Sequence, residues 1–231
     1  MSRTLNVVRM QLINRQTFVW VPLIILAGTL IVSLALYAMI ESAGATGPKY
    51  GGGVQAPLWY FGAVGVQALT RTFPFSQAMS VTRREFYVGT LTTAALTAGV
   101  LSAVFVVGGL FEQATGGYGM NGWFFYIPWM WESGPLAAGV IFFTVAMFAF
   151  VIGFWAATIF KRFGTVVTSV TLVGVGLVLV AVAWVITATQ SWPAFGETMQ
   201  ALGALGLAGC GILLTVLLAG SSFVTLRRAV P

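Results

Sequence analysis

Charge along this chain is sorted by position. Six long apolar segments can be marked out, and when the connecting segments are assigned to alternate sides, all of the 11 Lys and Arg residues except Lys49 fall on one side. All of the 5 carboxylates except Glu85 fall on the other side. Because Lys and Arg are retained on the cytoplasmic side during insertion, the pattern predicts an integral membrane protein with both termini in the cytoplasm.

The composition excludes a soluble domain and several chemistries. Hydrophobic residues make up 58% of the chain and charged residues 7%, whereas soluble domains carry roughly 25% charged residues. The chain has no histidine, which argues against haem-carrying bundles, zinc transporters and serine–histidine intramembrane proteases. The single cysteine, Cys210, excludes an intrachain disulfide. We therefore predict no metal site and no catalytic residue.

The predicted fold is all-α: a polytopic membrane protein with six transmembrane helices, preceded by a cytoplasmic amphipathic helix. Residues 1–17 place Leu5, Val8 and Leu12 on one helical face and are expected to lie along the cytoplasmic leaflet. At about 20 residues per span, the transmembrane domain of residues 18–226 holds spans at about 18–40, 58–76, 86–111, 134–160, 164–187 and 199–224. Residues 227–231 form a cytoplasmic tail.

The most informative window is the polar connection between the second and third spans. It reads TFPFSQAMSVTRREFYVGT over residues 72–90 and carries Arg83, Arg84 and Glu85 after Pro74. These charges are explained by a topological anchor, or by a short helix with a charged end that presses on a cytoplasmic partner.

With Phe-Pro-Phe at residues 73–75 and Val-Thr-Arg-Arg-Glu-Phe at residues 81–86, the window resembles the membrane subunits of the ABC-2-type transporter superfamily, the permeases of small bacterial ABC exporters. The basic N-terminal helix and the six spans extend the resemblance over the whole length. Members of this superfamily often have a sizeable outer element between the fifth and sixth spans, whereas residues 188–198 here form only a short loop.

The resemblance implies a permease subunit in the bacterial cell membrane. It implies docking on a separate ABC ATPase, present in two copies, which binds ATP and Mg²⁺, and pairing with a second six-span subunit, identical or homologous. The residues that it assigns to the coupling helix contacting the ATPase are Ser80, Val81, Thr82, Arg83, Arg84 and Glu85. Export as the direction of transport rests on the resemblance alone.

The chain is not expected to be an enzyme by itself or to bind a cofactor. Its only lysines, Lys49 and Lys161, do not follow the glycine-rich spacing that cradles ATP phosphates. No carboxylate lies at the centre of a span, so the usual ion-coupling residue of a secondary transporter is missing. An apolar pathway driven by an external motor fits these observations, with a hydrophobic or amphipathic drug, peptide or lipid as substrate.

Two further groups of residues are candidates for function. Gln67 and Arg71 are four residues apart and share a helical face, where Arg71 either snorkels to the headgroups or lines a pathway or interface. The outer segment of residues 116–131 is rich in aromatics, which form either an interfacial belt or an outer gate built on an amphipathic helix. The candidate gate residues are Trp123, Phe124, Phe125, Tyr126, Trp129 and Trp131. Glu112 and Glu132 flank the segment and are expected to stay in water.

Small residues recur four apart at Ala95, Gly99 and Ala103, and at Ala149, Gly153 and Ala157, which favours close helix packing within the subunit or between subunits. The alternative function is that of the six-span substrate-binding component of an energy-coupling-factor vitamin importer, which has the same size and span count. An intramembrane enzyme is the weakest reading, because no pair of acid–base residues is available in a span.

Overall fold

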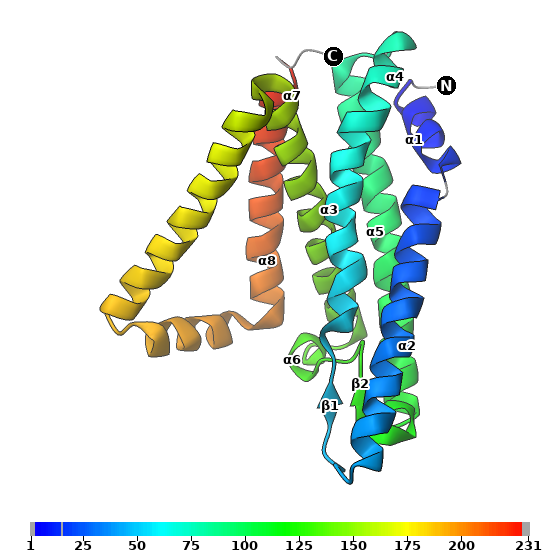
Figure 1. Cartoon of the computed structure of the whole chain (residues 1–231), viewed down its shortest axis with the longest axis vertical. Helices are drawn as coiled ribbons and strands as arrows, with labels where there is room; N and C mark the ends of the chain where they lie inside the picture. The colour runs from blue at the N-terminus through cyan, green and yellow to red at the C-terminus, as the bar shows by residue number, and fades with distance from the viewer. Residues whose placement is uncertain (1–2, 15, 228–231) are drawn as a thin grey trace.

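The computed structural model describes residues 3–14 and 16–227, and these form an almost wholly helical structure (Figure 1). The α-helices are α1 (Arg3–Ile13), α2 (Val21–Ser42), α3 (Gln55–Gln67), α4 (Phe73–Ala78), α5 (Arg83–Ala114), α6 (Pro128–Trp131), α7 (Pro135–Ala188) and α8 (Trp192–Leu226). Wider π-type turns occur at η1 (Gln16–Trp20), η3 (Ala68–Thr72) and η4 (Gly117–Asn121), and a 3₁₀ turn at η2 (Gly52–Val54). The strands β1 (Lys49–Tyr50) and β2 (Gly122–Trp123) pair in parallel. The all-α prediction is confirmed.

Four helical segments of the described chain are long and apolar enough to cross a membrane: Gln16–Ser42, Arg83–Ala114, Pro135–Ala188 and Trp192–Leu226. The predicted second span lies in α3, η3 and α4, which follow one another without a break over residues 55–78 but are not among these four segments. The predicted fourth and fifth spans are both contained in α7, which has 54 residues. The count of six spans and the cytoplasmic location of the termini stay predictions.

Two glycines break the longest helices. Gly164 in α7 has φ +81° and Gly203 in α8 has φ +62°, a left-handed backbone that glycine adopts without the strain of a Cβ. The chain reverses direction at Gly164, where the sequence placed the turn between its fourth and fifth apolar segments (Figure 1). Residues 165–188 then lean away from the other helices, and almost all of their side chains are exposed.

The break at Gly203 corrects the predicted loop before the sixth span. Residues 192–202 are helical and run from the far end of the leaning arm to the upright arm of residues 204–226, at a steep angle to that arm (Figure 1). The apolar sequence continues on both sides of Gly203, so the change of direction is marked only by the positive φ of this glycine.

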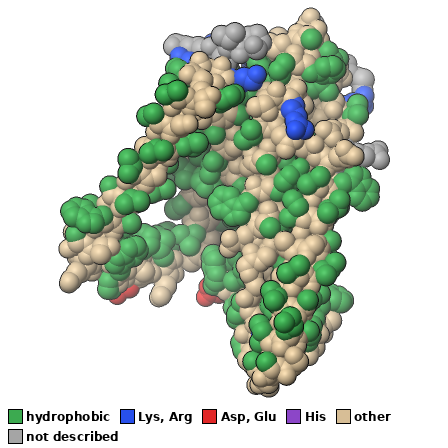
Figure 2. Space-filling view, in the orientation of Figure 1, with side chains coloured by type: hydrophobic (Ala, Val, Ile, Leu, Met, Phe, Trp, Pro, Cys, Tyr) green, Lys and Arg blue, Asp and Glu red, His purple; other side chains and the backbone are tan. Residues whose placement is uncertain are grey.

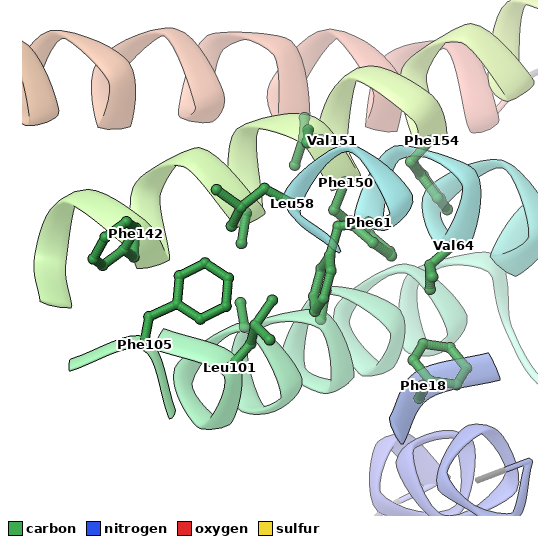
Figure 3. Close-up of a cluster of buried hydrophobic side chains, with 14 of the residues drawn as sticks. Phe18, Leu58, Phe61, Val64, Leu101, Phe105, Phe142, Phe150, Val151 and Phe154 are labelled. Carbon is green, nitrogen blue, oxygen red and sulfur yellow. The ribbon is translucent and has the colours of Figure 1, made fainter. Parts of the chain in front are cut away.

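The core lies where α3, α5 and the first arm of α7 meet. Phenylalanines fill it, with Phe105 edge-to-face against Phe142 at 5.0 Å between ring centroids, and Phe61 and Phe150 almost wholly buried (Figure 3). Such aromatic pairs stabilise a core beyond the area that they bury.

Glycines let α3 and α7 approach backbone to backbone. A Cβ on Gly153 would overlap the carbonyl group of Gly62, and a Cβ on Gly65 would overlap the carbonyl oxygen of Phe150. The stripe containing Gly153 therefore packs within the chain, as small residues do between membrane helices. The stripe of Ala95, Gly99 and Ala103 shows no such close packing at its glycine, because a Cβ on Gly99 would have no neighbour within 4 Å.

The two ends of the bundle carry opposite charge. Helices α1 and α4 and the C-terminal end of α8 lie at one end, and β1, β2 and α6 lie at the other (Figure 1). On the visible face, Lys and Arg side chains gather at the first end and Glu side chains at the second (Figure 2). The charge sorting read from the sequence is thus also a sorting in space.

Candidate functional site

The segment matched to the coupling helix is a turn followed by the start of α5, and it forms no separate helix. Ser80 has φ +55°, and Thr82 is the extended N-cap of α5. The Thr82 hydroxyl oxygen accepts from the Glu85 amide at 3.2 Å, while the Glu85 carboxylate accepts from the Thr82 amide at 2.9 Å. This reciprocal capping box satisfies two helix-end donors, so both residues have a local structural role.

Arg83 holds the end of α8. Its guanidinium donates to the carbonyl oxygen of Arg227 at 2.6 Å and to that of Leu226 at 3.4 Å. A cation at these last carbonyls also complements the negative end of the helix dipole. Nearby, the Tyr87 hydroxyl donates to the carbonyl oxygen of Ala219 at 2.6 Å. Arg83 is half-buried and joins α5 to α8.

The tip formed by α4 and the following turn presents an apolar and basic surface. Phe73 is fully buried and lies edge-to-face with Phe86 at 5.2 Å, which fixes α4 to α5. Phe75 of α4 is 58% exposed and Met79, which follows α4, is 59% exposed. Arg84, in the first turn of α5, is also exposed. We call Phe75, Met79 and Arg84 the tip surface.

Helix α1 packs on α5 at the same end of the molecule. Val7 fits against Gly89, where an added Cβ would lie 2.7 Å from the Val7 Cβ. Gln11 is fully buried, and its amide nitrogen donates to the Thr90 hydroxyl at 2.8 Å. The buried face of α1 thus contains Val7 and Gln11. Of the predicted apolar face, Val8 and Leu12 are half-buried and Leu5 is 46% exposed.

Gln67 and Arg71 line one narrow crevice, which holds about 20 Å³ and also contacts Asn14 and Thr17. The crevice lies between η3 and the junction of α1 with η1, so these side chains face the N-terminal segment. Gln67 also hydrogen-bonds the Tyr60 side chain, and Arg71 is exposed. The structure brings the pair together, and its role in a pathway or interface stays a prediction.

The aromatic outer segment folds back into the end of the bundle. It consists of η4, β2, an extended stretch and the single helical turn α6, so an amphipathic helix does not form. Phe124, Phe125 and Trp131 are buried, Trp123 and Tyr126 are half-buried, and Trp129 is 52% exposed. We call residues 117–131 the outer plug. Its role as a gate stays a prediction.

Glu112 anchors the outer plug, and the expectation that it stays in water is wrong. This carboxylate is fully buried at the end of α5. It accepts hydrogen bonds from the backbone amides of Phe124 at 3.0 Å, Phe125 at 2.9 Å and Tyr126 at 2.8 Å. Glu132 is exposed as expected. Sequence reasoning missed the anchor because the receiving amides carry no side-chain signature.

Tyr118 of the outer plug also hydrogen-bonds Glu112. Burial raises the pKa of the Tyr118 phenol above its ordinary value, and the negative charge of Glu112 raises this pKa further. The phenol therefore stays protonated and available as a donor to the carboxylate over the physiological pH range.

Lys49 is the one basic residue at this end among those that the structure describes, and it connects the outer loops. Its side chain is 6% exposed and forms an ion pair with Glu41, and its ammonium group also donates to the Met120 carbonyl oxygen at 2.8 Å. Because β1 pairs with β2 directly beside it, Lys49 joins the first outer loop to the outer plug. Its departure from the charge rule thus has a structural reason.

The described residues contain no group of three or more His, Cys, Asp or Glu side chains that could hold a metal ion. No protein-family model, no curated protein and no solved structure matches this chain. The fold and the charged ends therefore define the class only coarsely: an all-α chain with four helices of membrane-spanning length, as integral membrane proteins have.

Proposed function

We propose that this chain is the membrane-spanning permease subunit of an ATP-driven transporter of the ABC-2 type, and that the tip surface docks on a separate ATPase subunit. The observation that carries the proposal is the tip surface itself. Two large apolar side chains, Phe75 and Met79, are exposed there, and the basic Arg84 is exposed in the first turn of α5, directly after the turn that follows α4. Apolar groups that are exposed together and rimmed by polar residues are typical of protein–protein or membrane contacts, and the proposal takes the first of these.

The rigidity of the tip suits the transmission of motion. Phe73 fixes α4 to α5, the capping box fixes the turn, and Arg83 fixes the base of α5 to α8. A force on the tip surface would therefore move α3, α5 and α8 together. Within the segment Ser80–Glu85, the proposal assigns contact with the ATPase to Arg84 and positioning to Thr82, Arg83 and Glu85.

In this proposal the chain crosses the bacterial cell membrane six times, with α1 and the tip surface on the cytoplasmic side. The arm of residues 165–188 is apolar and almost unpacked within the chain, which leaves a face for a second six-span subunit. Residues 192–202 supply an outer element before the last span, as the superfamily often has. ATP binding on the partner would shift the populations of two states and export a hydrophobic or amphipathic substrate.

The test compares the exposed tip residues with an equally exposed residue elsewhere at the same end. Phe75→Ala with Met79→Ala, and Arg84→Ala separately, should reduce the amount of ATPase that co-purifies with the tagged chain. Phe163→Ala is the matched control, because Phe163 is 48% exposed beside the bend of α7. Equal ATPase recovery from tip and control variants would refute docking at the tip.

A further inference from the structure

The structure contains an apolar pocket of about 220 Å³ between α2 and α5. Phe18 and Pro22 line it from the N-terminal part of the chain, Phe61 lines it from α3, and Val100 and Leu101 line it from α5. Among the described residues of the lining, only Thr97 has a polar side chain, and its hydroxyl donates to the backbone carbonyls of Thr93 and Ala94 at 2.9 and 3.1 Å. The described lining thus offers hydrocarbon and no free side-chain donor.

The size and chemistry of this pocket suit a hydrocarbon chain. An apolar cavity of about 150 Å³ stays dry and accepts benzene, so a pocket of about 220 Å³ accommodates a longer apolar segment. The pocket lies between two helices of membrane-spanning length, Gln16–Ser42 and Arg83–Ala114. The hydrocarbon nearest to it is the acyl chain of a membrane lipid.

The polar crevice at Arg71 adjoins this pocket, since Phe18 lines both. Phe61 and Arg71 are 10 residues apart on α3 and η3, or about 15 Å at 1.5 Å per residue. That distance is about half the thickness of the hydrocarbon core, which is about 30 Å. An acyl chain seated beside Phe61 would therefore bring its headgroup to the level of Arg71.

The charged residues at the Arg71 end of the molecule favour an anionic headgroup. No carboxylate of the described residues forms an ion pair with Arg71. The ion pair within the described part of the chain joins Lys49 to Glu41, and it lies at the opposite end of the molecule. Among the described residues at the Arg71 end, the one carboxylate side chain is Glu85, which is engaged in the capping box of α5. Arginine binds phosphate through parallel N–H donors, and basic residues at a membrane surface attract anionic lipids.

We propose that the α2–α5 pocket and the Arg71 crevice together bind one anionic phospholipid of the cytoplasmic leaflet. The acyl chain occupies the pocket, and the phosphate lies at the Arg71 guanidinium, beside the polar side chains of Asn14, Thr17 and Gln67. This lipid ties the N-terminal segment to α3 and α5. The inference requires a chain embedded in a membrane and does not depend on docking of an ATPase.

The experiment reconstitutes the full chain in nanodiscs of equal parts phosphatidylglycerol and phosphatidylcholine with matched acyl chains, and counts retained lipids by native mass spectrometry. The wild-type chain should retain one phosphatidylglycerol. Arg71→Gln should lower the preference for phosphatidylglycerol about fivefold, because one basic residue near the surface contributes about that factor. Arg162→Gln, at the same end beside the bend of α7, should leave it unchanged.

A second pair of variants tests the acyl chain. Val100→Trp fills the pocket and should abolish retention of the lipid. Val107→Trp is the matched control, since both valines lie on α5 and are 66% exposed, but Val107 lines a different groove. Retention unchanged in Val100→Trp, or reduced equally by both tryptophans, would overturn the inference. An equal effect of Arg71→Gln and Arg162→Gln would overturn the placement of the headgroup.

Discussion

Replacing Glu112 should release the outer plug, and the three backbone bonds to its carboxylate set the scale. The Oε2 atom accepts from Phe125 and Tyr126, and Oε1 accepts from Phe124. In Glu112→Gln, the amide oxygen can keep the first two bonds, but the NH₂ group then faces the third amide. A buried donor left unsatisfied costs about 1–3 kcal/mol, so we expect a loss of about 2 kcal/mol.

In Glu112→Ala all three amides lose their acceptor, and we expect the outer plug to open fully. Hydrogen exchange at the three amides is the direct assay, because it reports local opening. A loss of about 2 kcal/mol corresponds to roughly thirtyfold faster exchange. Glu132→Gln is the matched control, since Glu132 is exposed at the same end of the chain. If Glu112→Gln exchanges no faster than this control, the anchoring role is refuted.

Three further changes probe packing and pH. Gly153→Ala should destabilise the bundle by about 1–3 kcal/mol in thermal unfolding, because its Cβ would overlap the Gly62 carbonyl, whereas Gly174→Ala in the open arm should not. Gly89→Ala should push α1 off α5, seen as faster hydrogen exchange in residues 3–13 with the rest of α5 unchanged. Because the pKa of Tyr118 is raised in the folded chain, its contribution to stability is full below pH about 10 and declines above it. Thermal stability should therefore fall less between pH about 9 and about 11 in Tyr118→Phe than in the wild type, and an equal fall would contradict this.

The all-α fold and the positions of some helix ends could be predicted from the sequence, because apolar runs and charged residues are local signals. The turn at residues 161–164 is one case, where Lys161 and Arg162 precede a left-handed glycine. The start of α5 is another, since Thr82 and Glu85 have the spacing of a capping box. This signal was present in the sequence and shows that the two residues serve the helix end.

Other features depend on partners far away in the chain. Glu112 is buried because backbone amides more than ten residues later in the chain turn toward its carboxylate. Arg83 forms its hydrogen bond because α8 ends beside it, and its partner Arg227 is 144 residues away in the sequence. The helix break at Gly203 is equally hidden, because Gly206, Gly209 and Gly211 nearby remain helical. Local patterns carry no record of such tertiary contacts.

The most direct test of the proposed permease is to purify the tagged chain from its native host in mild detergent and identify what co-elutes by mass spectrometry. The proposal predicts a stoichiometric ATPase with a phosphate-binding loop, together with a second six-span subunit that is either identical or homologous. Recovery of an intact chain without any ATPase, or of an ATPase pair joined to it only through a distinct scaffold membrane protein, would contradict the proposal.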